Sequence, residues 1–168
     1  MSQQDFLASH HVVVGLYPVA DAFAGGVSSD VISMKDYRRC TFFVFTGAVE
    51  DANISNIVTV DACSTAAAGA TTAIAFKSRV CASSTTVDAW GALTDRASTG
   101  HNFATATPAA NAVWMVEVDA ADMEAAAAGY PFVRLTIAET ANKTVTACCI
   151  VILSDPRHPV GTPLTAIA

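Results

Sequence analysis

The chain has 168 residues and a formal net charge of −6, and 52% of its residues are hydrophobic whereas only 14% are charged. This length suits a single domain, because two halves would each lie near the lower size limit for an independent hydrophobic core. The acidic balance argues against binding to nucleic acid or to an anionic membrane surface, since both need clustered lysine and arginine side chains.

The sequence carries no sign of a membrane segment or of an export signal. Its longest unbroken apolar run is 147–153, far below the roughly 20 residues that a spanning helix needs. The first eleven residues show neither the basic start nor the apolar stretch of a signal peptide. The five cysteines include no CxxC pair, and their odd number leaves at least one thiol unpaired, so we expect reduced, buried cysteines.

The first half of the chain has the pattern of successive strands. Residues 12–17 form the first expected strand, which Pro18 should end, and 19–23 should continue as extended chain. The strongest strand pattern is 37–46 (YRRCTFFVFT), in which aromatic and β-branched residues dominate. Because both faces of this segment are apolar, we expect it to lie in the middle of the core. Further strands are expected at 31–34, 57–63 and 71–79.

The second half contains the one expected helix. Residues 82–111 are rich in Ser, Thr, Ala, Gly and Asn and are expected to form loops with at most short strands. The helix is predicted near 119–128, where Asp119 can cap its start and Gly129 can end it. Strands are expected at 112–118, 132–138 and 144–153.

About eight strands separated by turns predict an all-β fold, a single-domain antiparallel β-sandwich. A parallel sheet is improbable because the crossover helices that it needs are missing. Among the β-sandwich topologies, a jelly-roll-like one is the preferred prediction, although the sequence does not fix the strand order. The predicted organisation is an N-terminal arm over 1–11, the sandwich over 12–154 and a C-terminal extended arm over 155–168.

The search for chemistry favours no catalytic, cofactor or metal site. The sequence lacks phosphate-binding glycine loops, the HExxH metal motif and the GxSxG nucleophile motif. His101 in a Gly-Asn context is a weak candidate for a general base, and a pair of glycosidase carboxylates is an equally weak alternative. We therefore expect a protein that is not an enzyme and that needs no cofactor.

Six segments, taken in order, resemble a family of small all-β virion proteins of tailed bacteriophages, of the capsid decoration or cement type. The matching segments are VISMKDYRRCTFFVFTGAV, TTAIAFKSRV, DAWGALT, AVWMVEVDAADM, YPFVRLTIAE and CCIVILSDPRHP. The resemblance covers roughly residues 10 to 160, and the order of the segments is more specific than any one of them.

The resemblance implies a structural virion protein on the outer surface of a capsid, assembled in the cytoplasm of the host bacterium. Its expected partners are the major capsid protein, whose neighbouring subunits it would bridge, and further copies of itself in a dimer or trimer. No direct contact with nucleic acid or membrane is expected. The alternatives are another structural virion component, such as a tail or connector protein, and a non-viral β-sandwich binding module.

Residues near both termini are the predicted interface candidates. The C-terminal tail contains three prolines and several apolar side chains, so it suits an extended segment lying across a neighbour. Arg157 is expected to form hydrogen bonds at the base of this arm. The candidates are His10, His11, Arg157, His158, Pro159, Val160, Leu164 and Ile167. The predicted core includes Phe42, Val44, Val116, Leu135 and Ile150.

Overall fold

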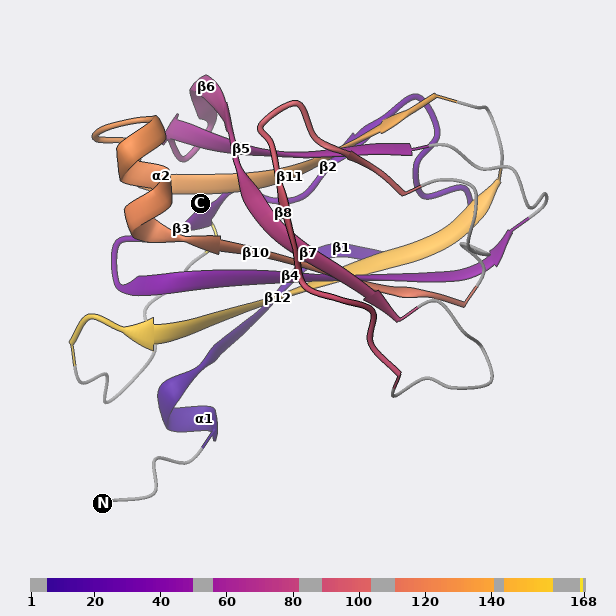
Figure 1. Ribbon diagram of the computed structural model, residues 1–168, viewed down its shortest axis with the longest axis horizontal. Coiled ribbons are helices and arrows are strands. Elements are labelled where there is room, and N and C mark those ends of the chain that lie inside the picture. Colours follow the sequence, from indigo (N-terminus) through magenta and orange to yellow (C-terminus); the bar gives the residue numbers. More distant parts are fainter. Residues whose placement is uncertain are drawn as a thin grey trace.

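Two antiparallel sheets face each other in the computed structural model, which describes residues 6–49, 56–81, 89–103, 111–140, 144–158 and 167 (Figure 1). The first sheet has the strand order β1-β12-β4-β10-β7-β8. These strands are β1 (His11–Val19), β12 (Val145–Pro156), β4 (Tyr37–Val49), β10 (Val113–Asp119), β7 (Phe76–Cys81) and β8 (Thr94–Arg96).

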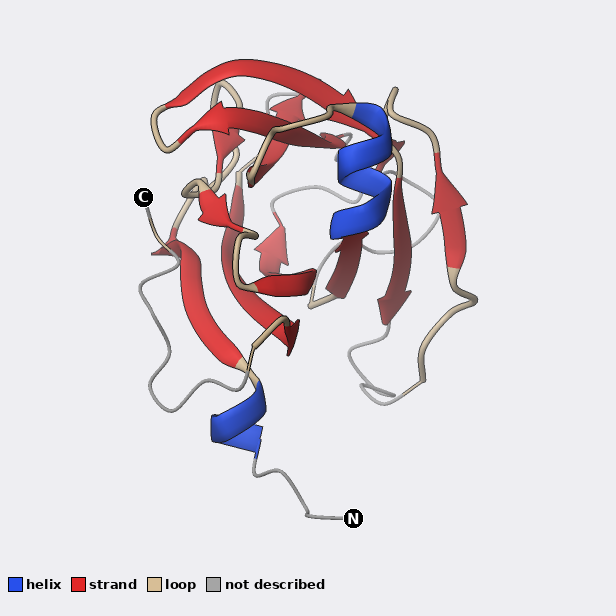
Figure 2. Ribbon diagram, turned by 90° about the vertical axis from the view of Figure 1, so that its left-hand side faces the viewer, coloured by secondary structure: helices blue, strands red, loops and turns tan. Residues whose placement is uncertain are grey.

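The second sheet has the order β2-β11-β5-β6, with β3 also paired to β11 and β9 to β5. Its strands are β2 (Val27–Ser28), β3 (Ile32–Ser33), β5 (Asn56–Thr65), β6 (Ala68–Ile74), β9 (His101–Asn102) and β11 (Phe132–Glu139). Helix α1 (Phe6–Ser9) precedes β1, and helix α2 (Ala120–Ala126) lies at one end of the sandwich (Figure 2).

The strand pairs define a jelly roll, as predicted. β1 pairs with β12, β2 with β11, β4 with β10 and β5 with β6, all of them antiparallel. These nested pairs are those of one long hairpin rolled into two sheets, the topology of eight-stranded jelly rolls. The remaining strands β3, β7, β8 and β9 are short additions to this framework.

The predicted strand 71–79 is divided between the two sheets. β6 ends at Ile74 and β7 begins at Phe76, so the chain passes from the second sheet to the first at Ala75. Ile74 and Phe76 are both buried and anchor the crossing in the core.

The core prediction is confirmed at four of five positions. Phe42, Val44, Val116 and Leu135 are fully buried between the sheets. Ile150 was wrongly predicted as a core residue, because it lies on the outer face of the first sheet and is only half-buried. The reason is that β12 is apolar on both sides, so alternation alone does not show which side faces inward.

Three expectations about the first half of the chain were wrong. Pro18 does not end the first strand, since β1 continues through it to Val19. This is tolerated because β1 is an edge strand with a partner on one side only, and its register shifts before Val19. Residues 20–25 then form turns instead of extended chain. The strand over 37–46 is central in its sheet, but only one of its faces is in the core, because Phe45 on the other face is 37% exposed.

Helix α2 forms where the sequence predicts it, but it ends at Ala126, before the predicted limit of 128, with Ala127 as its C-cap. The Asp119 carboxylate accepts a hydrogen bond from the Ala121 backbone N–H at 2.8 Å, which caps the start of the helix. Buried Met123 holds the helix against the core, and the positive φ of Gly129 turns the chain away after the helix.

Candidate interaction surfaces

The start of β4, the base of the C-terminal arm and helix α2 lie together at one end of the sandwich, which we call the α2 end. β1 begins there opposite the last residues of β12, and β4 begins there at Tyr37, which is paired with Pro156. The base of the C-terminal arm is fixed at this end, because the Arg157 backbone N–H donates to the Asp36 carbonyl at 2.8 Å. Arg157 Nε also lies 3.4 Å from the Tyr37 carbonyl oxygen, which confirms the predicted hydrogen bonding of Arg157.

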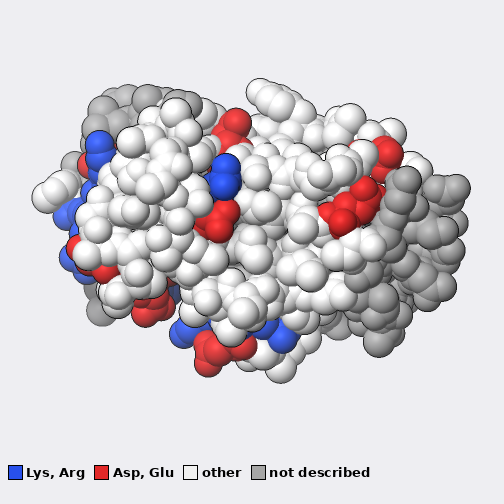
Figure 3. Space-filling model, turned by 90° about the horizontal axis from the view of Figure 1, so that it is seen from above, with Lys and Arg blue, Asp and Glu red and all other residues white. Residues whose placement is uncertain are grey.

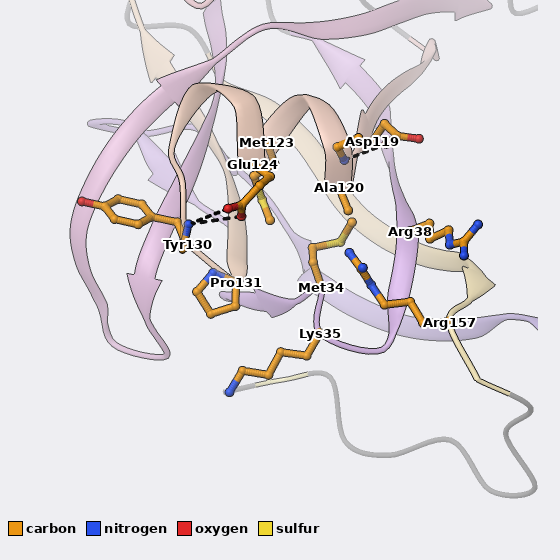
Figure 4. Close-up of a pocket in the computed structure, with 12 residues that line it drawn as sticks. Met34, Lys35, Arg38, Asp119, Ala120, Met123, Glu124, Tyr130, Pro131 and Arg157 are labelled. Atoms are coloured by element: carbon orange, nitrogen blue, oxygen red, sulfur yellow. Dashed lines mark hydrogen bonds between the residues drawn. The ribbon is translucent and has the colours of Figure 1, made fainter.

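A pocket of about 760 Å³ opens at the α2 end (Figure 4). The turn between β3 and β4, helix α2, the segment before β11 and the residue after β12 contribute to its lining. Figure 4 shows the Arg157 side chain beside Met34, with Lys35 and Arg38 extending to opposite sides. The residues that line the pocket include Met34, Lys35, Arg38, Asp119, Met123, Glu124, Tyr130, Pro131 and Arg157.

The carboxylates and the cations of this pocket have different roles. Asp119 caps α2, and both oxygens of Glu124 accept from the Gly129 backbone N–H at 3.1 and 3.2 Å. The cations are less engaged: Lys35 lies 5.2 Å from the ring centre of Phe132, and Arg38 forms no ion pair with a described residue. The pocket therefore has exposed basic groups although the whole chain is acidic.

The other predicted interface candidates lie near this end without forming a single site. The His10 ring stacks on Phe6 with 4.3 Å between ring centres, and the half-buried His11 lies 6.1 Å from the Tyr37 ring. His158 is exposed beyond β12, and Ile167 forms an isolated antiparallel bridge with Ile32. The candidates Pro159, Val160 and Leu164 lie outside the described residues.

A second candidate surface is the outer face of the first sheet along three neighbouring strands. Paired residues form apolar rows across it: Val14 is opposite Ile150, which is opposite Phe43, and Cys148 is opposite Phe45. Val12 is 48% and Val14 38% exposed. We call this surface the β1–β12–β4 face; it consists of Val12, Val14, Phe43, Phe45, Cys148, Ile150 and Ile152.

The outer face of the second sheet is polar by comparison. Arg134 Nη2 lies 3.2 Å from Asp61 Oδ2, and the Thr136 hydroxyl donates to the same oxygen at 3.0 Å. Seen from above, this side of the molecule carries side chains of both charge signs separated by uncharged surface (Figure 3). An antiparallel sheet that faces water normally has such a polar outer side, so the β1–β12–β4 face is the exception that needs explanation.

Sequence analysis missed the cations Lys35 and Arg38 and did not identify the β1–β12–β4 face as a surface. The available signal for that face was that the strands over 37–46 and 144–153 each carry apolar residues on both of their faces. The pocket had no comparable signal, because its cations come from distant segments of the chain. Lys35 and Arg38 lie on either side of Tyr37, which is 120 residues before Arg157 in the sequence.

Three further features of the described residues concern metal ligands, His101 and helix length. Among residues 6–49, 56–81, 89–103, 111–140, 144–158 and 167, no group of three His, Cys, Asp or Glu side chains could hold a metal ion. The His101 ring lies 6.1 Å from both Phe103 and Trp114, and burial, followed by the charge of Arg96, lowers its pKa. Within the same ranges, no helix is long and apolar enough to cross a bilayer.

The cysteines differ in accessibility, and this difference gives a prediction. All five are free, and only Cys148 is partly exposed, whereas burial raises the pKa of Cys149 to about 12. We expect one thiol, Cys148, to react with a thiol reagent in the dilute native protein, and the others only after unfolding. Burial also raises the pKa of Cys148, so less thiolate is present at a given pH and its reaction should accelerate only above the usual cysteine range. Mass spectrometry of partially labelled protein checks this, and early labelling of Cys40 or Cys149 would contradict it.

The comparisons with known proteins give one similar structure. No protein-family model and no curated protein sequence matches the chain. A solved structure, described as the crystal structure of SPBc2 prophage-derived protein YomS, is similar with 15% identity and a TM-score of 0.41. The similarity covers 85% of this chain and 92% of that chain.

Proposed function

We propose that this protein is a structural virion component that binds the outer surface of a tailed-phage capsid and stabilises it by bridging neighbouring major capsid subunits. The order of the resembling sequence segments supports the class of protein. The structural observation that carries the proposal is the α2 end, where the base of the C-terminal arm and a pocket with three cations lie together.

The chemistry of the α2 end suits a protein partner with exposed carboxylates. Arginine forms charge-assisted hydrogen bonds with carboxylates, and such bonds give orientation as well as affinity. Asp119 and Glu124 already accept backbone hydrogen bonds, so they compete little for Arg38. Each contact of this kind is modest, but contacts repeated around a symmetric shell give strong binding through avidity.

Charge reversal at Arg38 tests this proposal. We expect Arg38→Glu to weaken binding to expanded, tail-less heads of the encoding phage at least tenfold, which corresponds to about 1.4 kcal/mol. The control is Lys77→Glu, the same charge change at an exposed residue of β7 that lies outside this pocket. Co-sedimentation of the purified protein with heads that lack it measures both variants.

The same measurement separates the alternatives. Binding of the wild-type chain to purified tails but not to heads would favour a tail or connector role. Failure to bind any virion part would overturn the virion proposal and favour a non-viral binding module. Equal weakening by the Arg38 and Lys77 substitutions would show that net charge, and not the α2 end, controls binding.

A further inference from the structure

The β1–β12–β4 face is apolar at its centre and charged at its border, which is the composition of a protein interface. No member of the face is ionised at neutral pH. At the border, Arg39 lies 3.3 Å from Asp155 and 3.7 Å from Asp119. On the β7 side, Trp90 stacks over the Arg79 guanidinium at 4.9 Å, so part of the neighbouring sheet is already covered by the chain itself.

The two edge strands of this sheet differ in length and in charge. The edge strand β8 is short and carries Asp95 and Arg96, the usual protection of a sheet edge against association. The opposite edge strand, β1, has nine residues, no Asp, Glu, Lys or Arg, and a Tyr17 side chain that is 76% exposed. The chain itself covers the middle of this edge, where the Asp30 backbone N–H donates to the Gly15 carbonyl at 3.1 Å. An edge of this composition is otherwise an association site.

We infer that a second copy of this chain covers the β1–β12–β4 face, with the two faces packed against each other across a two-fold axis. Each copy carries a net charge of −6, so two copies approach most easily through a surface that has no charge of its own. A two-fold interface uses the same patch on both partners, and an uncharged apolar sheet face is compatible with itself. Pro18 and the register shifts in β1 disfavour a continuous sheet through the edge, which leaves face-to-face packing.

The size of the face sets the expected affinity. The outer side of the three strands extends about 30 Å along the nine residues of β1 and about 15 Å across, so the face, which is part of it, covers at most roughly 450 Å². Two such faces bury at most roughly 900 Å², less than the 1,200–2,000 Å² of standard interfaces. The dimer should therefore be weak, with a Kd in the micromolar range. This inference concerns the free protein and does not depend on capsid binding.

Sedimentation equilibrium of the full chain at several concentrations tests the inference. We expect the wild type to dimerise by about 100 µM and Val14→Lys to weaken dimerisation at least tenfold. The matched control is Thr71→Lys, which adds the same charge to an exposed position of β6, the edge strand of the other sheet, and should dimerise normally. Circular dichroism confirms that both variants are folded.

Thiol labelling of Cys148 provides a second readout on the unmodified chain. Labelling should slow as the wild-type concentration rises, because Cys148 lies on the covered face, and it should be independent of concentration in Val14→Lys. A wild type that stays monomeric at about 100 µM would overturn the inference, as would unchanged dimerisation of Val14→Lys. A dimer in which Cys148 labels at the monomer rate would show that another surface pairs the copies. Since these measurements use no capsids, their result is independent of the Arg38 experiment.

Discussion

Replacing Phe42 by alanine is expected to lower the free energy of unfolding by about 3–5 kcal/mol, the usual loss for a large buried aromatic side chain. Phe42 is fully buried on the inner face of β4. In the first sheet it is paired with Val116 on one side and Val151 on the other, and both are fully buried. The cavity left by the ring cannot be filled by side chains held at these fixed strand positions. Urea denaturation followed by circular dichroism measures the loss.

Phe45→Ala is the matched control, because it removes the same ring from the same strand. Phe45 lies on the outer face and is 37% exposed, so its loss leaves no closed cavity and should cost about 1–2 kcal/mol. A Phe42→Ala loss below 1 kcal/mol, or equal losses for the two variants, would contradict the orientation of β4.

The fold could be predicted because its signals are local. The alternation within 132–138 and the turns between segments indicate an antiparallel sandwich, and Asp119 and Gly129 mark the helix limits. The orientation of a strand is not local when both of its sides are apolar, as Ile150 shows. Such a segment is compatible with either side facing inward, and only the neighbouring strands decide between them.

The residues of the candidate site could be predicted only where they lie near a chain terminus. Arg157 was identified because it stands at the base of a proline-rich tail. Lys35 and Arg38 belong to the same pocket, but in the sequence they stand beside Asp36 and Arg39 in a strand and its preceding turn, with no motif that marks them as a site. The jelly roll brings them to Arg157 by pairing β4 with β12, a contact between distant segments that periodicity does not reveal.

The same pairing explains why the two proposed surfaces are separate. β12 and β4 share an outer face along their length, and their ends meet α2 at the α2 end. One pair of strands thus carries an uncharged lateral surface and a basic terminal surface. A protein that joins copies of itself through the first and a shell through the second would need no further domain to form a cross-linked layer.

Substitution of Gly100 by alanine is expected to lower the free energy of unfolding by about 2–4 kcal/mol. Gly100 has a φ of +93°, and an added Cβ atom would lie 2.6 Å from the Val58 carbonyl oxygen. Relief of this clash would push β9 away from β5, where His101 is paired with Val58. It would also disturb Phe103, which is buried and stacks on Trp114 at 3.9 Å between ring centres.

Gly25→Ala separates the clash from the cost of a positive φ. Gly25 has a φ of +68°, but nothing lies within 4 Å of an added Cβ atom, so this variant should lose only about 1–2 kcal/mol. Urea denaturation gives both losses, and near-ultraviolet circular dichroism reports the packing of Trp114. Only Gly100→Ala should alter that spectrum in the native state, because β9 leads directly to Phe103, whereas an added Cβ atom at Gly25 meets no other atom. Equal losses with an unchanged spectrum would show that β9 is not held against β5 as the structure has it.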